Sequence, residues 1–410
     1  MTELPKKGIA WDRLETMLDE ARTEDVDWRN GRIGVYIHYA GEDVLEVAKK
    51  AYLKYFSENG LGPKAFPSLA RFESEVIGMS LALFNAGPDA AGAMTTGGTE
   101  SIFLAVKAAR DHARRHRPEI AQPEIVAAQT AHPAFNKAAH FLGLRVRRVP
   151  VDAAFLADPK ALEAAIGRDT IMLVGSAPAF PHGVVDPIPA LGEIAERRGL
   201  WLHVDACVGG YIAPFARKLG IEMPAFDFTV PGVRSISADL HKYGYTAKGA
   251  SAVLYRDRES FSYQAYEFDD WPRGKYFTQS LVGTRAGGAI AAAWAVMNYL
   301  GEDGYLRITE RVLAVRRAIE DGVRKLGFEV WGKPQLGIVA YGMRDGDIFA
   351  VADRLAARGW FVGRLNEPRG IHLMLNLTHE PVVERYLADL AAARDEAART
   401  PRMANATVTY

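Results

Sequence analysis

A histidine and a lysine stand next to each other in the stretch Ser235–Tyr245, just beyond a run of small residues. The run Ser235–Ala238 is typical of the end of a strand, and His241 and Lys242 follow it closely. An amine in such a place can carry an aldehyde cofactor as a Schiff base, provided that desolvation or neighbouring cations lower its pKa enough for it to attack. Most lysines are instead solvated surface charges. The interpretation therefore depends on whether the chain supplies the other groups of such a site.

Two loops of small residues could bind a phosphate. The stretch Thr95–Ser101 opens a helical segment, where backbone amides could close on a phosphate and the helix dipole would favour its negative charge. A glycine turn capped by Thr99 is the alternative. The second loop, Ser280–Gly288, is equally consistent with an ordinary helix start, but it could reach a phosphate across a dimer interface. The candidate phosphate ligands in the two loops are Gly98, Thr99, Gly283 and Thr284.

Two polar residues stand at the ends of apolar strands. Asp205 lies near the end of Trp201–Ala206, where a buried carboxylate is costly unless a cation pairs with it. A protonated pyridine nitrogen would be such a cation, and the carboxylate would keep the ring an electron sink. His132 follows the strand Glu124–Ala128 and could stack on a planar ring. Taken singly, Asp205 is also consistent with a turn or cap residue, and His132 with a loop histidine.

The order of these parts along the chain suits pyridoxal phosphate. Asp205 would hold the ring nitrogen and Lys242 the aldehyde carbon. A Rossmann nucleotide site is disfavoured because Gly97–Gly98 lacks the three-glycine spacing. No clustered Cys/His spacing indicates a metal site. The predicted phosphate ligands nearest the lysine are Gly98, Thr99 and His241.

These groups need a scaffold that brings distant segments together. From about residue 64 to 300, short apolar strands alternate with helical stretches such as Ser101–Arg115 and Ile188–Arg198. Such alternation predicts an α/β fold with a mainly parallel sheet, helices on both faces and ligands at the carboxyl ends of the strands. The predicted strands are Glu124–Ala128, Val146–Val151, Thr170–Ser176, Trp201–Ala206, Phe226–Val230 and Ser251–Tyr255.

Smaller units flank this predicted large domain of residues 64–300. Residues 1–63 are predicted to form an N-terminal arm with helices at 10–30 and Asp43–Ser57. Residues 301–410 are predicted to form a small C-terminal α+β domain that begins with a helix at Gly304–Leu326. Its predicted strands and further helices are Phe328–Trp331, Gly337–Tyr341, Trp360–Val362, His372–Asn376, Asp345–Arg358 and Pro381–Arg399.

Composition limits the function classes. A chain of 410 residues is long enough for one large and one smaller domain. Lys+Arg and Asp+Glu are both 50, and this balance argues against broad nucleic-acid binding. The single cysteine, Cys207, cannot form an intrachain disulfide, which indicates a reducing compartment such as the cytoplasm. The most apolar long run, Gly287–Leu300, is too short to span a bilayer, so no transmembrane segment is expected.

Over roughly residues 30–300 the chain resembles the sphingosine-1-phosphate lyase group of pyridoxal-phosphate enzymes, which is related to the group II amino-acid decarboxylases. Two segments, Phe66–Glu75 and Ser176–Asp186, are similar to the lyase rather than the decarboxylase versions. The other specific matches are Thr96–Ser101, His132–Lys137, His203–Gly210, Asp239–Gly249 and Gly283–Gly287.

The resemblance implies the fold type I architecture of the pyridoxal-phosphate-dependent transferases and a homodimer with active sites at the subunit interface. It also implies retro-aldol cleavage of the C2–C3 bond of a phosphorylated amino alcohol, giving an aldehyde and an amine such as phosphoethanolamine. Lys248 occupies the position of the family's second active-site lysine, and Tyr36 or Tyr39 that of a tyrosine from the arm. With the stacking His132 and the Schiff-base Lys242, these residues make up the expected catalytic set.

The chain departs from the family pattern at one point. The lyases have Asn-x-Leu-His after the arm helix, whereas this chain has Asn59-Gly-Leu-Gly62, so a histidine that would help to bind the substrate's polar end is replaced by glycine. A shorter phosphorylated amino alcohol, a β-hydroxy amino acid or another amine therefore stand beside sphingosine-1-phosphate as substrates. An amino-acid α-decarboxylase, with Lys248 or Arg285 anchoring the carboxylate, is the alternative activity. A non-catalytic homologue is a third, disfavoured by the complete set of cofactor residues.

Overall fold

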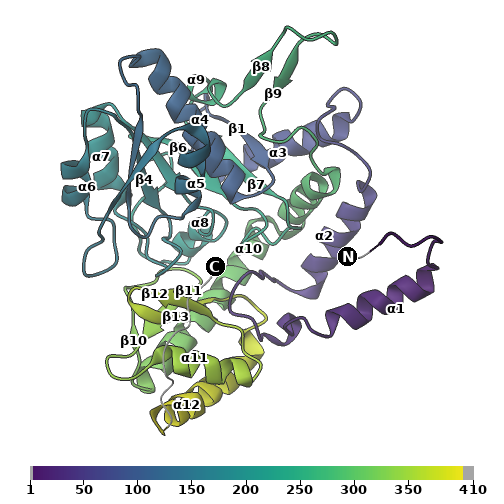
Figure 1. Cartoon of the computed structure of the whole chain (residues 1–410), viewed down its shortest axis with the longest axis vertical. Helices are drawn as coiled ribbons and strands as arrows, with labels where there is room; N and C mark the ends of the chain where they lie inside the picture. The colour runs from purple at the N-terminus through teal and green to yellow at the C-terminus, as the bar shows by residue number, and fades with distance from the viewer. Residues whose placement is uncertain (1–2, 400–410) are drawn as a thin grey trace.

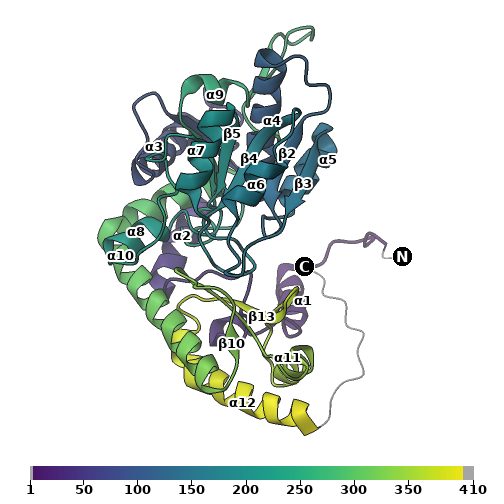
Figure 2. The same ribbon diagram turned by 90° about the vertical axis from the view of Figure 1, so that its left-hand side faces the viewer.

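The computed structural model describes residues 3–399, which form an N-terminal arm, a large α/β unit and a smaller α+β unit (Figure 1). In the arm, helix α1 (Trp11–Arg22) stands apart from the rest and has no buried residue. A 3-10 turn, η1 (Trp28–Asn30), leads to α2 (Glu42–Lys54), which packs along the long helix α10 (Gly287–Lys325). Helix α10 runs from the large unit to the small one and connects them (Figure 2).

The large unit contains a seven-stranded sheet with the order β1-β7-β6-β5-β4-β2-β3. Strand β7 pairs antiparallel with β6 and with β1, while the pairs from β6 to β3 are parallel. The mainly parallel sheet predicted from the alternation of elements is therefore confirmed. The strands are β1 (Ala91–Thr95), β2 (Glu124–Ala128), β3 (Arg145–Val149), β4 (Thr170–Ser176), β5 (Trp201–Asp205), β6 (Val233–Ala238) and β7 (Ser251–Tyr255).

Helices cover both faces of this sheet, so its central strands are buried on both sides. In β2, Ile125 and Ala127 join the apolar cluster beneath α4 and α5, whereas Val126 and Ala128 join the cluster on the opposite face. This is the period-two alternation of a strand, and the four positions from Ile125 to Ala128 are all apolar because both faces are covered. The helices of the unit are α3 (Pro67–Leu83), α4 (Gly98–His116), α5 (Ala134–Leu142), α6 (Pro159–Ala165), α7 (Ile188–Arg198), α8 (Ala213–Lys218) and α9 (Arg258–Ser262).

The register of β4, β5 and β6 aligns their carboxyl ends. Ser176 is the partner of Asp205, and Asp205 is the partner of Ser237. The chain then continues from β6 directly into His241 and Lys242. Because parallel strands end at a common edge, the polar residues of three distant segments meet there.

Three features of the sheet differ from the sequence-based prediction, one of them being that only the end of β6, Ser235–Ala238, was predicted as strand. The predicted strand Phe226–Val230 is wrong: this segment is a loop in which Asp227 accepts the backbone N–H of Thr229 at 3.1 Å and pairs with Arg217 at 3.1 Å. An aspartate that bonds its own backbone favours a turn over a ladder. Strand β1 was not predicted, because its sequence of alanine, glycine, methionine and threonine has a low strand propensity and is held by pairing with β7.

The small unit is built on a four-stranded antiparallel sheet with the order β10-β11-β13-β12. The predicted strand Trp360–Val362 is displaced, because Phe361 pairs instead with the arm through Arg32 and Gly34, and the strand begins at Gly363. The elements are β10 (Glu329–Val330), β11 (Ile338–Gly342), β12 (Gly363–Asn366) and β13 (Arg369–Met374), with α11 (Ile348–Ala357), η2 (Glu380–Val382) and α12 (Val383–Arg399).

Helix α10 begins earlier than the predicted Gly304, because the apolar run from Gly287 to Leu300 is also helical. The two parts meet at a kink at Gly301, whose φ of 54° and ψ of −172° suit glycine and few other residues. Within residues 3–399, we find no helix that combines the length and the apolar character needed to cross a membrane. A separate hairpin, β8 (Tyr266–Phe268) and β9 (Tyr276–Thr278), projects from the large unit (Figure 1).

A close contact at Gly337 joins the two units and gives a test of the packing. A methyl group added there would collide with the Tyr243 hydroxyl, which donates to the Leu375 carbonyl at 2.8 Å. We expect Gly337→Ala to lower the free energy of unfolding in urea by about 1–3 kcal/mol. Gly78→Ala is the matched control, because Gly78 lies at an exposed position of α3 with nothing within 4 Å of an added Cβ. This substitution should raise the free energy of unfolding by about 0.5–1 kcal/mol, since alanine is favoured over glycine inside a helix. Equal effects of the two variants would contradict the packing.

Candidate active site

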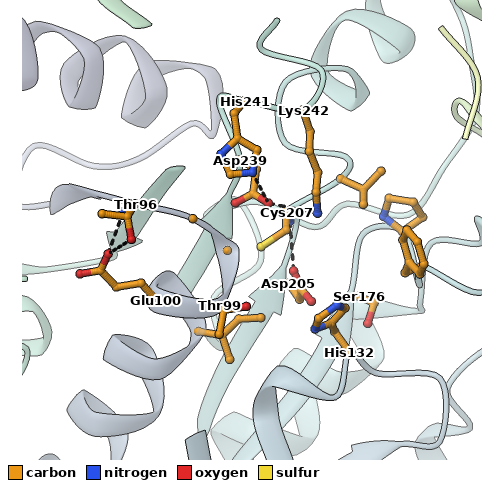
Figure 3. A pocket seen from close by; sticks show the side chains of 16 residues that line it. Thr96, Thr99, Glu100, His132, Ser176, Asp205, Cys207, Asp239, His241 and Lys242 are labelled. Atoms are coloured by element: carbon orange, nitrogen blue, oxygen red, sulfur yellow. Dashed lines mark hydrogen bonds and ion pairs between the residues drawn. The ribbon is translucent and has the colours of Figure 1, made fainter. Parts of the chain in front are cut away.

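A cavity of about 420 Å³ opens at the carboxyl ends of the parallel strands (Figure 3). Its walls come from the loop between β1 and α4, the loop between β2 and α5, the end of β4, the end of β5 and the turn after β6. Ligands of open parallel sheets bind at this edge. Six of the residues predicted from the sequence line the cavity, namely Gly98, Thr99, His132, Asp205, His241 and Lys242.

The start of helix α4 leaves backbone amides facing the cavity. Glu100 turns back to accept the N–H and hydroxyl of Thr96 at 2.7 and 2.6 Å, and its other oxygen accepts the N–H of Leu281 at 2.8 Å. The first amides of a helix have no partner inside it, so those of Gly98 and Thr99 are available to an anion. Gly98 is also required sterically, since an added Cβ would lie 2.7 Å from Cys207 Sγ.

Asp205 is a buried carboxylate held by neutral donors. It is 8% exposed, and its Oδ1 accepts the backbone N–H of Cys207 at 3.0 Å and the Ser237 hydroxyl at 3.3 Å. Within residues 3–399, no cationic side chain forms an ion pair with it. A buried carboxylate without a cation is costly, so the position suits a ligand that brings a positive charge.

His132 and His241 are both kept neutral by burial. The Nδ1 atom of His132 accepts the N–H of Ala134 at 3.1 Å, and burial is the main cause that lowers the pKa of His132. The Nδ1 atom of His241 accepts the N–H of Ala250 at 3.3 Å, and burial likewise outweighs Asp239 and lowers its pKa. Each neutral ring therefore carries its proton on Nε2, where it can donate to a ligand.

Lys242 differs from the sequence-based expectation in its charge. Its Nζ lies 3.0 Å from Oδ2 of Asp239, an acid that is 2% exposed. Burial by itself lowers the pKa of the Lys242 ammonium, but the charges of Asp239 and Asp205 outweigh burial, and the pKa is raised. The lowering of the Lys242 pKa expected from the sequence was wrong, because a buried acid three residues away pairs with the amine.

The second lysine is the one whose pKa is lowered. Solvent reaches part of the Lys248 side chain, but its ammonium donates to the carbonyls of Tyr36 at 3.0 Å and His241 at 3.2 Å. Desolvation first, and the positive charge of Lys242 second, lower the pKa of Lys248 to about 8. Neutral amine is therefore available on Lys248 near physiological pH.

A second cavity, here called the groove, adjoins the first and has a volume of about 530 Å³. It shares His132 and Phe180 with the first cavity and lies between the arm, the large unit and the small unit. Polar contacts are available on its wall from Arg364 and Asn366. Most of its wall is apolar and includes Val35, Ala352, Ala356, Phe361, Val362 and Leu365.

Several predicted residues lie outside the first cavity. Tyr36, with a φ of 66°, lines the groove, whereas the Tyr39 hydroxyl donates to Glu42 at 3.3 Å. Gly283 and Thr284 do not line either cavity of this chain, and the Thr284 hydroxyl accepts from Asn59 at 3.2 Å. Their predicted roles in phosphate binding across a dimer interface stay predictions.

Arg285 is not free to anchor a substrate carboxylate. Its guanidinium pairs with both oxygens of Glu73 and also donates to the Gly60 carbonyl at 3.0 Å. It lines neither cavity. Lys248 lines neither cavity either, but its ammonium donates to the His241 carbonyl at 3.2 Å and the charge of Lys242 acts on it, so it is the cation near the cofactor lysine.

Several residues of the cavity wall were not predicted as site residues, among them Asp239, Cys207 and Phe180. Asp239 stands three positions before Lys242, a spacing that places two side chains on one side of a tight turn and could have indicated the pair. Cys207 lies against the start of α4 and donates to Ser237 at 3.3 Å. Phe180 separates the first cavity from the groove; its position depends on tertiary folding, and we see no local signal for it.

The arrangement fits pyridoxal phosphate. Asp205 lacks a cation that a pyridinium nitrogen would supply, Lys242 can bond to the aldehyde carbon, and His132 can cover a ring face. The free amides of Gly98 and Thr99, with His241, face the place where a phosphate would lie. The cavity is also within the size range of cofactor sites.

Comparison with known proteins agrees with this chemistry. Residues 57–344 match the pyridoxal-dependent decarboxylase conserved domain. The chain is 43% identical over 406 residues to the sphingosine-1-phosphate lyase of Arabidopsis thaliana, covering 97% of this chain and 74% of that protein. It is 36% identical over 354 residues to a probable L-tyrosine/L-aspartate decarboxylase of Methanothermobacter thermautotrophicus, covering 85% of this chain and 94% of that protein.

Two solved structures are similar along almost the whole chain. The sphingosine-1-phosphate lyase of Burkholderia pseudomallei superposes with a TM-score of 0.93 at 36% identity, covering 97% of this chain and 94% of that one. The glutamate decarboxylase of Lactobacillus brevis superposes with a TM-score of 0.86 at 20% identity, covering 98% and 96%. Together with the family match, the first confirms the predicted fold type I, and the second is a likeness of fold alone.

Removing Lys242 tests its assignment as the lysine that carries the cofactor. Lys242→Ala leaves no amine to form the Schiff base, so we expect the purified protein to lose the visible absorption of covalently bound pyridoxal phosphate. Lys248→Ala is the matched control and should retain this absorption. An unchanged spectrum for Lys242→Ala would show that another group binds the aldehyde.

Proposed function

The chain belongs to the sphingosine-1-phosphate lyase family of pyridoxal-phosphate-dependent enzymes, and from that premise we propose that it cleaves the C2–C3 bond of an amino alcohol by retro-aldol chemistry. The products are an aldehyde and an amine, which is phosphoethanolamine when the substrate is phosphorylated. The observation that carries this proposal is an amine- and acid-lined cofactor cavity beside a mainly apolar groove, with His132 and Phe180 in the walls of both.

The residues around Lys242 have separate roles in the proposed reaction. When bound, pyridoxal phosphate supplies the electron sink for the pair left on substrate carbon 2. Asp205 would pair with the positively charged ring nitrogen, and His132 would cover a face of the ring. The amides at the start of α4, with His241, would hold the phosphate.

Lys248 is the proposed base for the C2–C3 cleavage. A base must take the proton of the 3-hydroxyl so that the oxygen can form a carbonyl as the bond breaks. An amine with a pKa of about 8 is partly neutral at physiological pH, which suits this task. Tyr36 provides the carbonyl that positions Lys248, and its side chain faces the groove where the substrate would enter.

The groove favours a substrate with an apolar part. Its aliphatic and aromatic wall begins at His132 and Phe180 and continues between α11 and the arm, so a hydrocarbon chain attached to carbon 3 would be removed from water there. Gly62 stands where the family pattern has a histidine that would help to bind the substrate's polar end. This replacement extends the proposed substrate class from sphingosine-1-phosphate to a shorter phosphorylated amino alcohol, a β-hydroxy amino acid or another amine.

Amino-acid α-decarboxylation is the second candidate, supported by the decarboxylase relative at 36% identity. It is less well supported by the geometry, because the guanidinium of Arg285 is occupied by Glu73. The two reactions differ in which bond of the same bound amine is broken, so their products distinguish them.

We further propose a homodimer that works in the cytoplasm, in sphingolipid breakdown. The exposed apolar side chains of α1, including Trp11 and Leu18, and those of the β8–β9 hairpin, including Trp271, are the kind of surface that a second copy would cover. A single buried cysteine is compatible with a reducing compartment.

Product analysis tests the proposed function. The purified holoenzyme is incubated with phosphorylated amino alcohols of graded chain length, β-hydroxy amino acids and common amino acids, and both aldehyde and CO2 are measured. We expect aldehyde from the phosphorylated amino alcohols, with kcat/KM rising as the chain lengthens into the groove. Carbon dioxide without aldehyde from every substrate would establish the decarboxylase instead.

The pH profile tests the role of Lys248. Since the neutral amine is the active form, log kcat/KM should rise with pH through a midpoint near 8, the pKa of Lys248, and level off above it. In Lys248→Met this limb should disappear and the plateau rate should fall by about 10²–10⁴. Lys137→Met, on the exposed surface of α5, is the control that keeps the limb. A limb that survives in Lys248→Met would assign it to another group.

A further inference from the structure

Two buried carboxylates lie at the ends of neighbouring strands, and their surroundings differ. Asp205 ends β5 and accepts hydrogen bonds from neutral donors. Asp239 directly follows β6 and faces cationic or titratable nitrogens, with Lys242 Nζ at 3.0 Å and His241 Nε2 at 3.6 Å from its Oδ2. Asp205 has a role in the proposed reaction, whereas Asp239 has none so far.

We propose that Asp239 is a positioning residue that keeps the Lys242 nitrogen in place as a cation, both when Lys242 is joined to the cofactor and when a substrate amine has replaced it. This inference rests on Lys242 carrying the cofactor. It does not depend on which substrate bond is then broken.

The backbone of Asp239 is fixed by two hydrogen bonds: its N–H donates to the Cys207 carbonyl at 3.3 Å, and its carbonyl accepts the N–H of Lys242 at 3.2 Å in a tight turn. The start of α4 encloses the carboxylate, since an added Cβ on Gly98 would lie 2.8 Å from Asp239 Oδ2. An acid that is 2% exposed cannot turn to water, so it is stable as an anion only beside a cation.

Exchange of amines on the cofactor conserves charge if Lys242 remains a cation. When bound, the cofactor would supply the aldehyde carbon that Lys242 and a substrate amine occupy in turn, and a Lys242 side chain displaced from it would be a free ammonium. Asp239 then pairs with this ammonium 3.0 Å away, as in the structure, so the lysine stays beside the cofactor instead of entering the groove.

The two lysines of the site are thereby kept in different charge states. Lys242 has a carboxylate partner, whereas Lys248 donates to two backbone carbonyls and has none. One lysine then acts as the held cation and the other as the neutral amine. The titratable groups around Asp239 that bear on any pH test are Lys242 and His241 on its own turn, Cys207 and Asp205 from the end of β5, and Lys248.

A spectral pH titration of the holoenzyme without substrate tests this role. Removing the negative charge disfavours the protonated Schiff base of Lys242, so in Asp239→Asn the midpoint of the visible absorption change should fall by about one pH unit or more. Asp239→Glu, which keeps the charge, should stay closer to the parent midpoint. Asp227→Asn is the matched control: Asp227 is also 2% exposed, but it pairs with Arg217 away from the cavity, and its midpoint should not move.

An unchanged midpoint in Asp239→Asn, with the cofactor still bound, would overturn the proposal, because a merely structural carboxamide would leave the titration as it was. Asp239→Ser serves as a second neutral variant if Asp239→Asn does not fold, and the same two outcomes apply. Because no substrate is present, a chain that proved to be a decarboxylase would give the same titration, so failure of this inference and failure of the proposed function are distinguishable.

Discussion

The register of β4, β5 and β6 determines where every group of the site lies. Ser176, Asp205 and Ser237 form a row at the end of the sheet because the three strands run parallel and in step. A slip of one residue in β5 would turn Asp205 to the opposite face of the sheet, where an apolar helix would meet it. The position of the cofactor cavity is therefore determined mainly by strand pairing, and the loop residues complete its walls.

Burial of charge is the second constraint, and the site meets it in two ways. Asp239 has its compensating cation within the chain, whereas Asp205 has hydrogen bonds but no cation among the described residues. The difference marks the place of a positively charged ligand more specifically than the shape of the cavity does. Glu100 is likewise stabilised by hydrogen bonds, because its carboxylate accepts the N–H of Thr96 and the N–H of the distant Leu281.

The sequence predicted those parts of the molecule that local patterns encode. Five of the six predicted strands of the large unit were found within one or two residues. Four of them, β2, β4, β5 and β7, are buried and mostly apolar, and β3 combines valines with arginines at the edge of the sheet. The six cavity residues could be named because each follows a strand or opens a helix. The displaced strand near Phe361 and the raised pKa of Lys242 could not be foreseen, because both depend on partners that only the fold brings close. The prediction of a strand at Phe226–Val230 was wrong because Asp227 accepts a hydrogen bond from its own stretch of backbone, which makes this apolar segment a loop.

The turn that carries Lys242 touches all three units of the chain. Its next residue, Tyr243, is bonded to Leu375 of the small unit, and Lys248 is bonded to the Tyr36 carbonyl of the arm. The turn itself continues from β6 of the large unit. The segment that carries the cofactor lysine is therefore also a point of contact between the large unit, the small unit and the arm, so the position of Lys242 depends on how all three pack together.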